Sequence, residues 1–352
     1  MKIKLIPLLL IIFACLSLAG CKGKDSVEVA FITDGGTVED ARYNESCYAG
    51  LVKFCNEKNV TYKAFVPEVN VVEGYLAQIE LAVNEGAKII VCPSYMLEEA
   101  VYKAASLYPK VNFVLVDGMP HNEDYSDTTI AENVMPITFA EEEAGFLAGY
   151  AAVRDGYERL GFLGGMAEES VIRYGYGFIQ GADYAGIELG QKVYIAYTYT
   201  GTFDINQGVQ DMAAVFYDYS VKAIMACGGE GGSSVMKAAE EKSGAVIGTD
   251  YDHGYESPAV VFSCVKNLEK AVYDALNDYY NGNFEGGKER HLTCAEEGVM
   301  LTMDSGKFNT FSDIEYNAIY DELANKKIVP YSDTSIGTTA ELNLVNTEII
   351  YQ

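Results

Sequence analysis

Short apolar runs that alternate with longer helical stretches constrain this chain more than any other feature of its sequence. The first run, residues 27–33, is rich in β-branched and aromatic residues and ends in Asp34-Gly35-Gly36. Comparable runs recur in both halves of the chain, separated by helical stretches of about ten to eighteen residues. Strands joined through helices form parallel sheets, and uninterrupted apolar runs fit strands that are buried on both faces. The pattern predicts an α/β fold.

The chain of 352 residues is long enough for two such units. The expected strands are 27–33, 61–66, 88–92, 111–116, 159–165, 192–199, 222–227, 245–249 and 260–265. The expected helices are 40–58, 71–85, 97–107, 139–154, 171–189, 206–217, 233–242 and 268–280. Two sets of about four strand–helix units predict two Rossmann-like lobes, each with a parallel sheet.

No Pro- or Ser-rich linker separates the two halves, which favours lobes joined by several strands that cross a hinge. We expect residues 27–136 and 265–300 to form the first lobe. Residues 137–264 and 301–352 are expected to form the second lobe.

The first twenty residues have a different character. Lys2 and Lys4 precede an apolar run over residues 5–18, which is short for a membrane span but typical of a signal peptide. Leu18-Ala19-Gly20-Cys21 follows and resembles a bacterial lipobox, so we expect cleavage before Cys21 and a lipid on its sulfur. Residues 21–26 then form a tether outside the cytoplasmic membrane. The alternative is an ordinary signal peptide with an incidental cysteine.

Composition excludes several classes of function. Asp and Glu number 51 against 25 Lys and Arg, and a net charge of −26 argues against nucleic-acid binding. The three histidines are far apart, and no GxSxG, HExxH or phosphate-loop motif occurs. We expect no enzymatic activity, no metal and no cofactor.

The six cysteines beyond Cys21 form no CxxC motif, and we expect them to be mostly reduced and buried.

The carboxyl ends of the predicted strands carry glycines and carboxylates. Asp34, Asp117 and Asp250 follow three different strands, and Gly228-Gly229 follows a fourth. Ligands bind at the carboxyl ends of strands in open parallel sheets, where carboxylates accept hydrogen bonds and glycines admit close approach. Any one of these residues has an alternative interpretation as a turn former, but the set indicates a ligand site.

Six motifs in a fixed order resemble one known family. They are Phe31–Asn44, Glu142–Ala152, Gly161–Met166, Tyr199–Asp204, Ile247–Asp252 and Ser263–Asn267. Together they span nearly the whole chain after Cys21 and resemble the basic membrane protein family of nucleoside-binding lipoproteins, which serve ABC transporters. The resemblance implies a type I periplasmic-binding-protein-like fold, in which two lobes close over a ligand.

The resemblance also implies which side chains hold the purine base. Tyr43 and Phe203 fall at the positions of the two stacking aromatics, and Asp117 falls at that of the carboxylate that reads the base edge. Core packing is the alternative role for each aromatic residue. Tyr43 stands where the family usually has phenylalanine, and His253 stands where it usually has glutamine.

The remaining implied contacts concern the ribose and the rim. Asp250 and Lys266 resemble the pair that holds the ribose hydroxyls, and we expect them to meet across the cleft only when the lobes close. The alternative for Lys266 is a solvated residue at a helix start. Gly229 would contribute backbone contacts. The rim of the other lobe would include Asp34, Asp40 and Asn44.

These features predict a lipid-anchored receptor that binds purine nucleosides outside the cytoplasm and passes them to an ABC transporter permease. Within binding proteins, the alternative is a receptor for a pentose or another small sugar. A surface sensor or adhesin on the same fold is a further alternative, and a nucleoside hydrolase is a third.

Cys21→Ser tests the predicted anchor. Loss of the thiol should abolish lipidation and move the protein from the membrane fraction to the soluble fraction, with ligand binding unchanged. Cell fractionation and mass spectrometry of the N-terminus measure this. An unchanged distribution between the fractions would contradict the lipobox.

Overall fold

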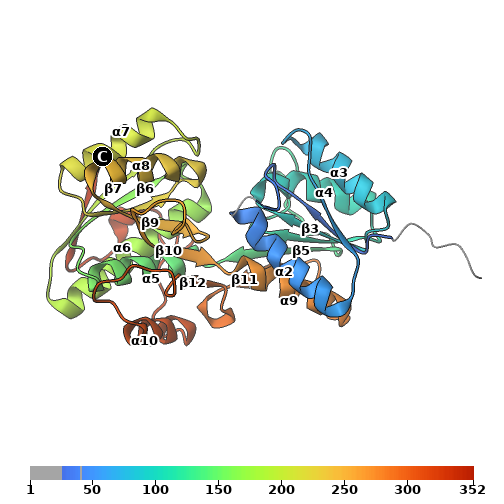
Figure 1. The fold of residues 1–352 in the computed structure, drawn as a ribbon. Helices are drawn as coiled ribbons and strands as arrows, with labels where there is room; N and C mark the ends of the chain where they lie inside the picture. Colours follow the sequence, from blue (N-terminus) through green and yellow to red (C-terminus); the bar gives the residue numbers. More distant parts are fainter. Residues whose placement is uncertain (1–25, 40–41) are drawn as a thin grey trace, which may run out of the picture.

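The computed structural model describes residues 26–39 and 42–352. Two lobes lie side by side, each built around one central sheet (Figure 1). This architecture confirms the predicted fold class. Cys21 and Asp40 lie outside the described residues. Within the described ranges, no helix combines the length and the apolar character needed to cross a membrane.

The N-terminal lobe contains a six-stranded parallel sheet. Its strands, in order across the sheet, are β11 (Arg290–Leu292), β5 (Val134–Phe139), β4 (Asn112–Val116), β3 (Ile89–Pro93), β1 (Val29–Ile32) and β2 (Tyr62–Phe65). One face is covered by α3 (Val72–Asn84) and α4 (Glu98–Leu107). The other is covered by α2 (Tyr43–Lys58) and α9 (Leu268–Tyr280).

Strand β1 shows why its sequence lacks polar alternation. Val29 and Phe31 belong to the core under α2 and α9, whereas Ala30 and Ile32 belong to the core under α3 and α4. All four side chains are fully buried. The apolar run therefore reflects burial on both faces of the sheet, as predicted.

The C-terminal lobe contains a seven-stranded sheet, in which only the β10–β12 pair is antiparallel. Its strands, in order, are β12 (Val299–Leu301), β10 (Val260–Lys266), β9 (Ala245–Asp250), β8 (Ala223–Cys227), β6 (Arg159–Gly164), β7 (Val193–Tyr199) and β13 (Thr347–Tyr351). Its helices are α5 (Glu141–Arg154), α6 (Glu169–Leu189), α7 (Gln207–Asp218), α8 (Gly232–Lys242) and α10 (Asp313–Ala324). Helices α7 and α8 pack on one face of the sheet, and α5 and α6 pack on the other.

The chain passes between the two sheets three times, from β5 to α5, from β10 to α9 and from β11 to β12 (Figure 1). The helix predicted from Phe139 begins two residues later, because Phe139 is the last residue of β5. Strand β5 was not predicted, and its Pro136 lacks the N–H group that a ladder hydrogen bond requires. The strand tolerates Pro136 because β11 pairs only with residues 137–139.

Helices α5 and α6 approach each other at backbone distance. A Cβ atom added at Gly177 or Gly181 would overlap a carbonyl oxygen of α5, and one added at Gly145 or Gly149 would overlap a carbonyl oxygen of α6. Four glycines on two facing helices are therefore required by the packing. They hold α5 and α6 together as one unit at the hinge end of the C-terminal lobe.

Gly177→Ala should destabilise the protein by about 1–3 kcal/mol, because the added methyl group has no space beside the Glu142 carbonyl. Gly232→Ala is the matched control, since the nearest atom to its added Cβ lies 3.9 Å away. Urea unfolding of both variants measures the difference. Equal stability of the two variants would show that the α5–α6 contact relaxes freely.

Candidate functional site

Three of the predicted site residues meet where the lobes join. Asp117 directly follows β4 of the N-terminal lobe, whereas Asp250 and Lys266 end β9 and β10 of the C-terminal lobe. Asp117 and Asp250 have φ angles of 62° and 69°, in the left-handed region that few residues other than glycine adopt. Such backbone strain concentrates at functional sites.

The Lys266 ammonium is the centre of this cluster. Its Nζ lies 2.8 Å from both carboxylate oxygens of Asp117, 3.1 Å from Asp250 Oδ1 and 3.1 Å from Glu141 Oε1. The side chain is only 2% exposed, so the solvated alternative for Lys266 is wrong. The contact with Asp117 joins the two lobes.

Asp250 and Lys266 do not need lobe closure to meet, and that expectation is wrong. The two residues end neighbouring strands of one sheet, in which Val265 pairs with Asp250. Asp117 is the residue that reaches this pair from the other lobe. The Lys266–Asp117 distance, unlike the Lys266–Asp250 distance, depends on how the lobes are arranged.

Burial and charge act in opposite directions on this cluster. Burial alone would lower the pKa of Lys266, but Asp117, Asp250 and Glu141 together raise it well above its usual value. Burial raises the pKa of Glu141 to about 7, while Lys266 opposes that shift and Asp117 adds to it. Lys266 therefore stays charged at neutral pH, and Glu141 changes its charge near neutrality.

Two tyrosines border the same carboxylates. The Tyr174 hydroxyl on α6 donates to Asp250 Oδ1 at 3.2 Å. The Tyr43 ring is partly exposed, whereas its hydroxyl is buried and has no hydrogen bond of normal geometry among the described residues. Burial, followed by the Asp117 carboxylate, raises the pKa of Tyr43 well above its usual value. Both hydroxyls remain protonated and can only be donors to the neighbouring carboxylates.

Asp34 and Asn44 form a separate pair in the N-terminal lobe. Asn44 Nδ2 donates to Asp34 Oδ1 at 2.7 Å, and the Asp34 backbone N–H donates to Asn44 Oδ1 at 3.2 Å. Asn44 is buried, whereas Asp34 is partly exposed. Because Asn44 directly follows Tyr43, the pair ties the end of β1 to the first turn of α2.

Phe203 lies over two glycines in the C-terminal lobe. A Cβ added at Gly165 would overlap the Phe203 ring, and one added at Gly229 would lie 3.6 Å from it. Gly229 has a φ of 53° and begins a short 3₁₀ turn after β8. The predicted stacking residue and the predicted backbone contact are therefore neighbours.

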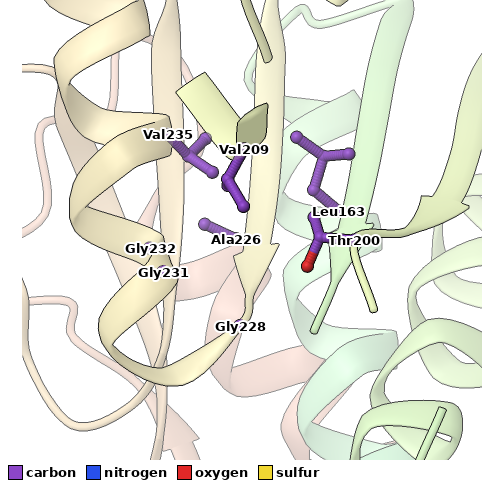
Figure 2. Close-up of a pocket in the computed structure, with 8 residues that line it drawn as sticks. All are labelled: Leu163, Thr200, Val209, Ala226, Gly228, Gly231, Gly232 and Val235. Atoms are coloured by element: carbon purple, nitrogen blue, oxygen red, sulfur yellow. The ribbon is translucent and has the colours of Figure 1, made fainter. Parts of the chain in front are cut away.

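Next to this loop, apolar side chains from the adjoining strands and helices point toward one another (Figure 2). The narrow hollow among them cannot hold a water molecule, and we interpret it as a packing seam. Its lining residues are Leu163, Thr200, Val209, Ala226, Gly228, Gly231, Gly232 and Val235.

A second set of ionic contacts crosses between the lobes at Arg42. Its guanidinium lies 3.3 Å from Glu256 and 3.6 Å from Glu230, both in the C-terminal lobe. Glu256 also lies 3.3 Å from His253 Nδ1. His253, the departure from the family pattern noted above, is thus next to a contact between the lobes. Arg42 is 34% exposed, so solvent weakens these pairs.

A larger hollow of about 410 Å³ lies among α9, β11 and the residues before β12. Four of its charged residues already pair with one another, Lys270 with Asp274 and Arg290 with Asp278. We therefore place the candidate site at the cluster around Lys266.

Among the described residues, no His, Cys, Asp and Glu group is arranged to hold a metal ion. The six described cysteines are free and buried, as predicted.

Sequence reasoning missed Glu141, Tyr174 and Arg42. Glu141 begins a run of three glutamates in the first turn of α5, where acidic residues are common because they interact favourably with the helix dipole. It differs from its neighbours in being 3% exposed, which no local pattern reveals. Glu141 lies next to a predicted crossing between the lobes, and this position is the signal from which its role could have been predicted.

Comparison with known proteins identifies relatives along nearly the whole chain. A family model described as "ABC transporter substrate-binding protein PnrA-like" (Bmp) matches residues 27–335. Basic membrane protein A1 of Borrelia garinii subsp. bavariensis is 28% identical over 93% of this chain and 97% of its own length. The ABC transporter nucleoside-binding protein BmpA of Lactococcus lactis subsp. cremoris is 26% identical, over 89% and 94% respectively.

Solved structures support the fold. A solute-binding protein of an ABC transporter system from Aeropyrum pernix K1 superimposes with a TM-score of 0.65 and 22% identity. The superposition covers 86% of this chain and 87% of that one. The two-lobed architecture of this chain is therefore that of type I periplasmic-binding-protein-like solute receptors.

Lys266→Met should destabilise the protein by about 3–5 kcal/mol at pH 8, because buried carboxylates lose their counter-charge. The loss should be smaller at pH 5, where Glu141 is neutral and no longer an unpaired buried charge. Lys53→Met, which removes an exposed ion pair with Glu269, should have little effect at either pH. Urea unfolding at both pH values measures this, and a pH-independent loss would contradict the electrostatic account.

Proposed function

The chain belongs to the Bmp family of PnrA-like ABC transporter substrate-binding proteins, and from this we propose that it captures purine nucleosides between its lobes and delivers them to an ABC permease. The observation that carries the proposal is the pair of carboxylates, Asp117 and Asp250, held from opposite lobes around one buried lysine. A related protein bears the name nucleoside-binding protein. The protein performs no chemistry on its ligand in this proposal.

The base is proposed to stack between Tyr43 and Phe203. The partly exposed ring of Tyr43, with its hydroxyl turned inward, suits a stacking surface, and stacking contributes about 1–3 kcal/mol per base. Asp117 would accept hydrogen bonds from donors on the base edge. Its side chain is 19% exposed, which leaves part of the carboxylate accessible to a ligand.

The ribose is proposed to contact Asp250, whose side chain is 28% exposed. A carboxylate has about four lone-pair positions, so Asp250 can accept from Tyr174, Lys266 and a ligand hydroxyl together. Lys266 orients this carboxylate and offsets its negative charge. The backbone of Gly229 would line the same side of the ligand, next to Phe203.

The protein is proposed to act outside the cytoplasmic membrane, attached through a lipid on Cys21. Its sequence support is the lipobox Leu18-Ala19-Gly20-Cys21 after an apolar run. A tethered receptor keeps its ligand close to the permease, since both are confined to one membrane surface.

Titration of a nucleoside, its 2′-deoxy form, the free base and free ribose tests the proposal. The free base should bind about 3–6 kcal/mol more weakly than the nucleoside, because two hydrogen bonds to charged groups are lost. The 2′-deoxynucleoside should fall between them. Isothermal titration calorimetry with a guanosine or adenosine series measures all four affinities.

Asp250→Asn should reduce the difference between nucleoside and base while sparing base stacking. Asp252→Asn is the matched control, because Asp252 bonds only to Gly254 and Ser305 within the described contacts. If the free base binds wild type as tightly as the nucleoside, the ribose assignment is wrong. If ribose alone binds tightly and nucleosides do not, the protein is a sugar receptor.

A further inference from the structure

Glu141 is a buried carboxylate with half of its hydrogen-bonding capacity unused. It is the first residue of α5, directly after the chain crosses from the N-terminal lobe, and is 3% exposed. Oε1 lies 3.1 Å from Lys266 Nζ, whereas Oε2 is buried without a hydrogen bond among the described residues. The Arg173 guanidinium approaches Oε2 only to 4.0 Å. Burial of a carboxylate costs free energy that a single ion pair offsets only in part, so the role of Glu141 is sought in the neighbour that it contacts.

The neighbour on which it acts is the lysine. An ammonium has three N–H donors, but Lys266 Nζ has four carboxylate oxygens within 3.1 Å. These oxygens belong to three residues, so the carboxylates compete for the ammonium. A proton on Glu141 removes one competitor and turns the lysine more fully toward Asp117 and Asp250. Fewer lone pairs of those two carboxylates then remain for another donor.

We infer that Glu141 is a positioning residue of the ligand site: its ionised carboxylate draws Lys266 toward the hinge and leaves Asp117 and Asp250 free to accept hydrogen bonds from the ligand. This inference rests on the proposed function. Glu141 itself does not contact the ligand in this mechanism. It sets how much of the lysine's charge the two ligand-binding carboxylates receive.

Among the groups that face one another around Lys266, Glu141 is the one whose pKa is placed near neutrality. Lys266 faces it from β10, Asp117 from the end of β4, and Arg173 and Tyr174 from α6. The pKa values of Lys266, Arg173 and Tyr174 are raised above their usual values, so these three groups keep their protons at neutral pH. Burial raises the pKa of Glu141 to about 7.

A second titratable pair lies behind Asp117 in the N-terminal lobe. His121 Nε2 and Glu98 Oε2 are 3.2 Å apart, and Asp117 contributes to the raised pKa of Glu98. The pH dependence of ligand affinity in wild type would not distinguish an effect of this pair from an effect of Glu141. A variant at Glu141 that retains shape and removes only the charge separates them.

The experiment measures nucleoside affinity by calorimetry from pH 5.5 to pH 8.5. Wild type should bind the nucleoside about tenfold more tightly at pH 8.5 than at pH 5.5, because the ligand favours the ionised form of Glu141. The change in affinity should have its midpoint near pH 7. Glu141→Gln should be nearly independent of pH, with an affinity close to that of wild type at pH 5.5. Glu141→Asp, which restores the charge, should recover part of the pH dependence.

Glu143→Gln is the matched control. Glu143 lies in the same helical turn, but its carboxylate accepts from the Cys294 backbone N–H and does not contact the lysine. It should keep the wild-type pH profile. A flat wild-type profile, or the same profile in Glu141→Gln as in wild type, overturns the inference.

Proton release on binding gives a second measurement that needs no variant. Wild type should release about half a proton per nucleoside between pH 6 and 7, measured by calorimetry in buffers of different ionisation enthalpy. Tight binding without proton release overturns the role of Glu141 and leaves the proposed function intact. Absence of nucleoside binding at every pH overturns both.

Discussion

One buried ammonium at the hinge determines how the two lobes face each other. Lys266 comes from the C-terminal lobe, and its shortest contacts are to Asp117 of the N-terminal lobe. With Asp250 and Glu141, three carboxylates oppose one cation, so the cluster carries a surplus of negative charge when Glu141 is ionised. Hydrogen-bond donors from a ligand can stabilise that surplus on the exposed parts of Asp117 and Asp250, whereas a second anion cannot. In the proposed function, the cluster would therefore favour neutral ligands that carry several hydrogen-bond donors, such as a nucleoside.

The secondary structure places most of this cluster on one unit. Asp250 and Lys266 end neighbouring strands, and Glu141 and Tyr174 lie on helices α5 and α6, which touch through their glycines. Only Asp117, with Tyr43 nearby, belongs to the other lobe. A rotation between the lobes therefore changes the Asp117–Lys266 contact and leaves the other contacts of the lysine in place. The proposed ligand contact to Asp117 would therefore be coupled to the arrangement of the lobes.

Local sequence patterns predicted the elements whose burial is regular. Helix α9 has the predicted bounds, Leu268–Tyr280, and strand β1 lies within its predicted run. Strands β11 and β12 were not predicted, because they have three residues each and are defined by pairing with distant strands. Strand β13 was also not predicted; it is an edge strand without buried side chains, so its sequence has no apolar run of the buried kind. In the site, Asp117 and Asp250 were predicted because each follows a readable strand, whereas Lys266 was predicted only through the resemblance to the family. Glu141 was missed because its burial depends on Lys266, which lies far away in the sequence.

A second cation, Arg42, also lies between the lobes, and the net charge of −26 explains why its position matters. Two strongly acidic lobes repel each other as they approach, and this repulsion is greatest where no counter-charge intervenes. Arg42 brings a positive charge from the N-terminal lobe to Glu230 and Glu256 of the C-terminal lobe. It is more exposed than Lys266, so salt screens its contacts while the buried lysine is little affected. The buried contact thus aligns the lobes at the hinge, and the exposed contact offsets the electrostatic repulsion between them.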